Sequence, residues 1–151
     1  MKLSINWIIG HSAVIAELSA KWINVKITEL AGDFSLILLT ERVLDDMNEL
    51  ANEGEELIST EFERLSKSIE AVLKENSYVK PLGYIELRNH NGLNLFSGIA
   101  YSQGEIIAGP STSKSYEVVN RVLYKLGLER RQDVDAFNHL GLDGVINGMS
   151  K

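Results

Sequence analysis

Carboxylates are the side chains of this 151-residue sequence that are concentrated enough to suggest a function. The segment 41–63 contains nine carboxylates and one arginine, a net charge of −8, whereas the whole chain has −6. The acidity is therefore local, and a local acidic surface can attract a basic protein partner. The nine carboxylates are Glu41, Asp45, Asp46, Glu49, Glu53, Glu55, Glu56, Glu61 and Glu63.

Five of these carboxylates are predicted to share the face of a helix opposite its apolar side: Asp45, Asp46, Glu49, Glu53 and Glu56. Asp45, Glu49 and Glu53 are spaced at intervals of four residues, so a continuous helix would stack them in one line. The simplest interpretation is a solvated helix face, and the functional interpretation is a surface that binds a basic protein. A metal site is not predicted, because no histidine and no EF-hand spacing accompany these carboxylates.

A second polar cluster follows Gly109-Pro110 and is predicted to join a strand to a helix. Exposed amides at a helix N-terminus favour anions, and a lysine would add positive charge. However, Ser113 occupies the place of the glycine that precedes the lysine in a phosphate-binding loop. The alternative interpretation is that these hydroxyls cap the following helix. The candidate anion-binding residues are Ser111, Thr112, Ser113, Lys114 and Ser115.

The histidines and the basic C-terminal third give no specific signal. His11, His90 and His139 are far apart in the sequence, and no nucleophile elbow or other local signature marks a catalytic centre. The spacing between the last two predicted helices is too long for a helix-turn-helix motif. A sequence pI near 5.1 also argues against nucleic-acid binding. We therefore predict no catalytic residue, no metal and no cofactor.

The absence of cysteine excludes disulfides and thiolate metal sites, and it fits a reducing compartment, although a periplasmic or secreted protein can also lack cysteine. The N-terminal segment is interpreted as a strand rather than a signal peptide. No apolar run approaches the roughly 18–20 residues that span a bilayer. These features predict a cytoplasmic protein with no membrane partner. We expect one domain over residues 1–151, with a frayed tail at 143–151.

The hydrophobic pattern predicts an α+β fold with a largely antiparallel sheet of five or six strands and two to four packed helices. Residues 43–73 have a helical period and are expected to form two helices or one kinked helix. Gly54 could mark the break, and Thr60 with Glu63 could form a capping box. The segment 13–18 fits a strand or a helix. The predicted strands span 3–9, 21–30, 34–40, 84–88, 93–101 and 105–108, and further helices span 115–126 and 133–140.

Three functional hypotheses follow. The first is a small protein-binding module, such as an immunity or antitoxin-like inhibitor whose acidic helix face docks on a basic toxin or nuclease. The second is a small-ligand or phosphate-binding domain, enzymatic or not, that uses the segment Ser111 to Ser115. The third is a structural subunit of an oligomer, in which Gly54 would allow close helix contact.

Overall fold

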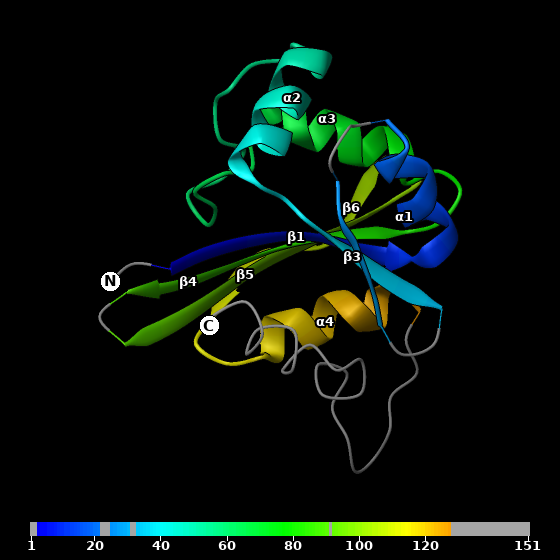
Figure 1. Ribbon diagram of the computed structural model, residues 1–151. Helices are drawn as coiled ribbons and strands as arrows, with labels where there is room; N and C mark the ends of the chain where they lie inside the picture. Colours follow the sequence, from blue (N-terminus) through cyan, green and yellow to red (C-terminus); the bar gives the residue numbers. More distant parts are fainter. Residues whose placement is uncertain (1–2, 22–24, 31–32, 91, 128–151) are drawn as a thin grey trace.

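The computed structural model describes residues 3–21, 25–30, 33–90 and 92–127. Within these residues, six strands form one antiparallel sheet and four helices pack on it (Figure 1). This arrangement confirms the predicted α+β fold, including its strand and helix numbers. The predicted helix at 133–140, the tail at 143–151, His139 and the Asn91 turn position lie outside the described residues.

The sheet has the strand order β2-β3-β1-β4-β5-β6. Its two central strands, β1 and β4, pair with each other and are buried over most of their length. The predicted hairpin of β2 and β3 and the meander of β4, β5 and β6 are both present. The strands are β1 (Leu3–His11), β2 (Ile27–Glu29), β3 (Phe34–Leu38), β4 (Leu82–His90), β5 (Leu93–Ser102) and β6 (Glu105–Ser113).

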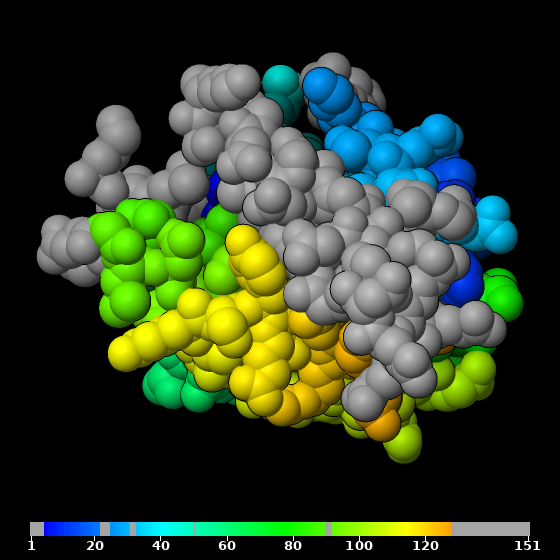
Figure 2. Space-filling model, turned by 90° about the horizontal axis from the view of Figure 1, so that it is seen from below, coloured from blue at the N-terminus to red at the C-terminus, as the bar shows by residue number. Residues whose placement is uncertain are grey.

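Helices cover both faces of the sheet (Figure 1). One face is covered by α1 (Ser12–Ser19), α2 (Glu41–Ala51) and α3 (Lys67–Asn76), and the other by α4 (Glu117–Lys125). Figure 2 shows the second face, with α4 lying across it. Because successive side chains of a strand alternate between faces, Ile8 packs in the core under α1, α2 and α3, whereas Trp7 packs in the core under α4.

Two glycines let α4 approach the sheet closely. A Cβ atom added to Gly83 on β4 would lie 2.5 Å from Cγ1 of Val122, and one added to Gly98 on β5 would lie 2.9 Å from Cγ1 of Val118. Real Cβ atoms are not found at such distances from carbon, so larger side chains here would force α4 away from the sheet. The apolar side of α4 is thereby held against β4 and β5.

Several element boundaries differ from the predictions. The ambiguous segment 13–18 is helical and belongs to α1. Among the described residues of the predicted strand 21–30, the paired ones are Ile27–Glu29, which form the short edge strand β2. β6 continues past the predicted end at Ala108 to Ser113, because its second half still pairs with β5.

The helical region 43–73 forms two helices separated by residues 52–66, which we call the connecting loop. α2 ends because Asn52 adopts the left-handed conformation, with φ of 50°. α3 begins after Ser66, whose hydroxyl accepts a hydrogen bond from the Ile69 amide at 3.2 Å. The predicted capping box at Thr60 and Glu63 is therefore wrong, because the N-cap residue of α3 is Ser66, later in the chain than Thr60.

Gly54 lies in the connecting loop rather than on the apolar side of a helix. Its φ of +119° is a conformation that other residues rarely adopt, and no atom lies within 4 Å of the place where its Cβ would be. Backbone conformation thus explains this glycine, which lies, as predicted, in the break between the two helices, whereas a close helix contact with another subunit stays a prediction.

Candidate partner-binding site

An open groove of about 260 Å³ lies between α2 and the connecting loop, and we call it the acidic groove. α2 contributes one carboxylate to its lining, and the connecting loop contributes two more together with one guanidinium. The loop leaves α2, descends toward the sheet and returns to α3 (Figure 1). The lining residues are Asp45, Asn48, Glu55, Leu57, Glu63, Arg64 and Ser66.

The acidic groove has an excess of negative charge. Its guanidinium, on Arg64, is paired at 2.8 Å with the Glu41 carboxylate, which is not among the lining residues. The Glu63 carboxylate lies 3.6 Å from the guanidinium of Arg88. Asp45 and Glu55 are exposed, and neither side chain makes a hydrogen bond or ion pair with another described residue. These two carboxylates are therefore available to a cation in solvent.

The five predicted partner-binding carboxylates do not share one helix face. Asp45, Asp46 and Glu49 lie on α2, but α2 ends at Ala51. Glu53 and Glu56 belong to the connecting loop, so the predicted line through Asp45, Glu49 and Glu53 is interrupted by the left-handed turn at the end of α2. The projection onto a single helix was wrong for these two residues, whereas their role in binding stays a prediction.

Glu56 has a cationic neighbour. Its carboxylate lies 2.9 Å from the ammonium nitrogen of Lys67 at the start of α3. The hydrogen bond and the charge of Lys67 lower the pKa of Glu56, and the same contact raises the pKa of Lys67. Because both side chains are exposed to solvent, this pair adds little stability. It does reduce the negative charge that Glu56 presents to a partner.

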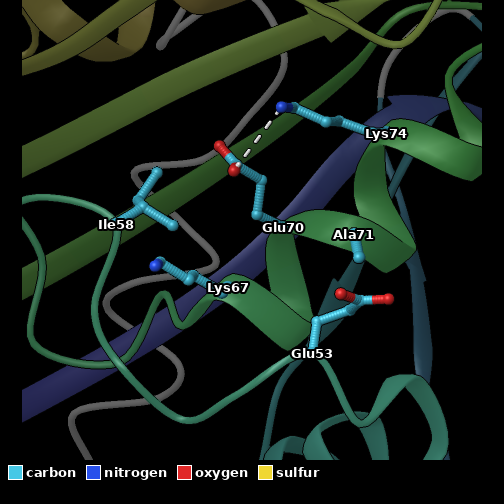
Figure 3. Close-up of a pocket in the computed structure, with 6 residues that line it drawn as sticks. All are labelled: Glu53, Ile58, Lys67, Glu70, Ala71 and Lys74. Carbon is cyan, nitrogen blue, oxygen red and sulfur yellow. Dashed lines mark ion pairs between the residues drawn. The ribbon is translucent and has the colours of Figure 1, made fainter.

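A second depression, of about 360 Å³, lies between α3 and part of the connecting loop (Figure 3). It contains two lysines and two glutamates, with Lys74 lying 3.6 Å from Glu70. Because the charges balance, this depression offers no preference for a cationic partner. The residues that line it are Glu53, Ile58, Lys67, Glu70, Ala71 and Lys74.

A row of polar side chains crosses the sheet beneath the connecting loop, and we call it the polar row. Its members are paired from strand to strand: Asn6 on β1, Glu86 on β4, Ser97 on β5 and Thr112 on β6. Three of them are buried, and Glu86 has no exposed surface. A charged side chain in this position must be compensated, because burial of an unpaired carboxylate is strongly unfavourable.

The Glu86 carboxylate is compensated by three donors. It accepts hydrogen bonds from the amides of Glu63, at 2.8 Å, and Arg64, at 3.0 Å, both in the connecting loop. The Tyr84 hydroxyl donates a third, at 2.8 Å. Burial, and then the charge of Glu86, raise the pKa of Tyr84, so this hydroxyl keeps its proton and remains a donor.

Arg88 connects the same loop to the sheet. Its Nη2 donates to the carbonyl of Glu61 at 3.2 Å and to the hydroxyl of Ser97 at 3.0 Å. The hydroxyl of Ser97 also lies 2.8 Å from that of Thr112, which donates to the Glu61 carboxylate. Glu86 and Arg88 were not predicted as site residues. Their alternation with Ile85 and Leu87 is typical of a solvated strand face, and only Tyr84 on the same face signals that this face is buried.

The candidate anion-binding segment is mostly a strand. Ser111, Thr112 and Ser113 belong to β6, so the predicted loop begins later than expected. Two first-turn amides of α4 have side-chain acceptors: Ser113 Oγ accepts from the Val118 amide at 3.4 Å, and Ser115 Oγ from the Glu117 amide at 3.3 Å. The N-cap residue of α4 is Tyr116, which makes no side-chain cap hydrogen bond, so the prediction that one of the hydroxyls at 111–113 occupies the cap position is wrong.

The environment of Thr112 is unfavourable for an anion. The Glu61 carboxylate contacts the Thr112 hydroxyl and places a negative charge beside this part of the segment. Lys114 is exposed, and it makes no hydrogen bond or ion pair with the rest of the described chain. Anion binding stays a prediction, with less geometric support than the acidic groove has.

His11 has a structural environment. Its Nε2 lies 3.0 Å from the carbonyl oxygen of Leu126 at the end of α4, and its ring stacks on Phe34 with centroids 4.7 Å apart. Among the described residues, no group of three or more histidine, aspartate and glutamate side chains is arranged to hold a metal ion. No helix in the described part of the chain is long and apolar enough to cross a membrane.

No protein-family model, curated protein or solved structure matches this chain. Function is therefore inferred from the fold and from the chemistry of the acidic groove.

Proposed function

We propose that this protein is a protein-binding module whose acidic groove docks on a basic protein. The observation that carries the proposal is the exposed carboxylate pair of Asp45 and Glu55, which lines an open groove without a partner among the other described residues. The local net charge of −8 over residues 41–63 supports it, because that charge extends the attraction beyond the groove itself.

The groove has the chemistry to accept a lysine or arginine side chain of the partner. The cationic head would meet Asp45 and Glu55, and its methylene stem would lie against Leu57, which is 43% exposed. Exposed ion pairs each contribute only about 0.2–1 kcal/mol. The carboxylates would therefore act mainly on the association rate and on the choice of partner, rather than on affinity.

Asp46 and Glu49 on α2, together with Glu53 and Glu56 on the connecting loop, add to the negative charge of this part of the chain. We place all four in the surface that steers the partner. An inhibitor of the immunity or antitoxin type, acting in the cytoplasm on a basic toxin or nuclease domain, is the instance that such a surface would serve. The lack of cysteine in the chain supports that setting.

Stopped-flow binding of a fluorescent octa-arginine peptide tests the proposal. The groove variant carries Asp45→Lys with Glu55→Lys, and the control carries Glu17→Lys with Glu75→Lys, two exposed carboxylates on α1 and α3. Both variants change the net charge equally. We expect the groove variant to associate about tenfold more slowly at about 0.01 M salt, with a smaller decrease in the control.

The salt dependence provides the second part of the test. Between about 0.01 M and 0.15 M salt the Debye length falls from about 30 Å to about 8 Å. The difference between wild type and groove variant should therefore shrink over this range. Equal decreases in the two variants would show that only net charge matters, and the acidic groove would then lose its assigned role.

A further inference from the structure

The connecting loop is long for the two helices that it joins. Helix–helix connections usually have about 2–8 residues, and ordered loops beyond about 12–15 residues are usually functional. This loop spans residues 52–66, and its two halves are hydrogen-bonded to each other: the Ile58 amide donates to the Leu65 carbonyl at 3.1 Å. Phe62, near its centre, is only 2% exposed. The loop thus has a defined conformation, as Ω-loops do.

Charged groups of the sheet hold this conformation. The Glu86 carboxylate, with no exposed surface, accepts from the amides of Glu63 and Arg64, and the guanidinium of Arg88 donates to the Glu61 carbonyl. A carboxylate is expensive to bury, and an apolar residue of similar volume often serves stability as well or better. The buried charge therefore indicates a requirement for the loop conformation itself.

The two residues whose amides Glu86 holds are also residues of the acidic groove. Glu63 and Arg64 both line it, and Arg64 further connects the loop to α2 through its ion pair with Glu41. The position of the loop side of the groove relative to Asp45 on α2 consequently depends on the contacts of Glu86.

We propose that Glu86 is a positioning residue for the acidic groove, which sets the connecting loop in the conformation that a cationic partner meets. This inference rests on the proposed function. A loop that is ordered before binding does not lose conformational entropy when the partner arrives, so association is faster and tighter.

Hydrogen exchange combined with octa-arginine binding tests the positioning role. Glu86→Gln keeps the shape of the side chain, but its amide nitrogen cannot accept from a backbone amide. We expect about tenfold or greater loss of protection at Glu63 or Arg64, with little change in β4 and β5, together with slower association. The matched control is Glu70→Gln, which removes the same charge from a carboxylate that accepts from Tyr101 and does not line the groove.

Several results would overturn the inference. One is rapid exchange of the Glu63 and Arg64 amides in the wild-type protein, which needs no variant. Another is a uniform loss of protection across the sheet in Glu86→Gln, which would indicate a role in global stability alone. A third is wild-type association by Glu86→Gln despite local loss of protection.

Two further outcomes are decisive. If the wild-type protein does not bind octa-arginine at low salt, the docking function fails and the positioning role fails with it. If Glu86→Gln does not fold, Arg88→Lys replaces it, because lysine keeps the charge but cannot bridge the Glu61 carbonyl and the Ser97 hydroxyl. Slower association and reduced protection in the loop would then support the inference, and wild-type behaviour would contradict it.

Discussion

Replacing Glu86 with alanine is predicted to destabilise the protein strongly. The change leaves three donors without their acceptor: the amides of Glu63 and Arg64 and the hydroxyl of Tyr84. Each unsatisfied buried donor costs about 1–3 kcal/mol, but water that enters beneath the loop will satisfy some of them. We therefore expect a loss of about 4 kcal/mol in the free energy of unfolding.

Urea denaturation monitored by tryptophan fluorescence measures this loss. For an m-value of about 2 kcal/mol/M, the midpoint should fall by about 2 M with the slope unchanged. Glu70→Ala is the comparison, because it removes one hydrogen bond to Tyr101 and one partly buried ion pair with Lys74. It should cost about 1 kcal/mol. A Glu86→Ala loss no larger than that of Glu70→Ala would refute the argument that the buried carboxylate secures the loop.

Two further predictions concern pH and phosphate. Burial, and next the hydrogen bond to Glu70, raise the pKa of Tyr101. The contribution of the protonated Tyr101 hydroxyl to folding stability is therefore complete below the ordinary tyrosine pKa of about 10 and is lost as pH rises above it. Tyr101→Phe should flatten the alkaline decline in unfolding free energy, and an unchanged slope would contradict this. The Glu61 carboxylate, which contacts Thr112, should repel an anion from this segment. Inorganic phosphate should therefore shift the melting temperatures of wild type and Lys114→Ala equally. A shift that is lost only in Lys114→Ala would favour the anion-binding alternative.

The strand framework was predictable from the sequence because its signals are local. The alternation of apolar residues and the turn glycines at 92 and 104 define the meander of β4, β5 and β6, and these features act within a few residues. The same local signals identified α4. Side chains at helical spacing predicted α2 and α3, whose amphipathic faces do pack on the sheet.

The connecting loop was not predictable in the same way. Ile58, Leu65 and Ile69 fall at helical spacing, but Ile58 and Leu65 are brought together by a backbone hydrogen bond across the loop instead. The decisive contacts come from Glu86, more than twenty residues later in the chain. Local sequence predicted where the carboxylates are concentrated. It could not predict that Glu53 and Glu56 leave the helix, because that depends on tertiary contacts.

Glu86 holds the connecting loop by its main chain, and this has a consequence for how the surface could change over evolution. An amide N–H is present in every residue except proline, so the contacts at positions 63 and 64 are independent of the side chains there. The charges displayed by the loop could be exchanged one by one while its path over the sheet is retained. The fold thus separates the path of this loop from the side chains that the loop displays, a property that would let the proposed binding module follow a changing partner.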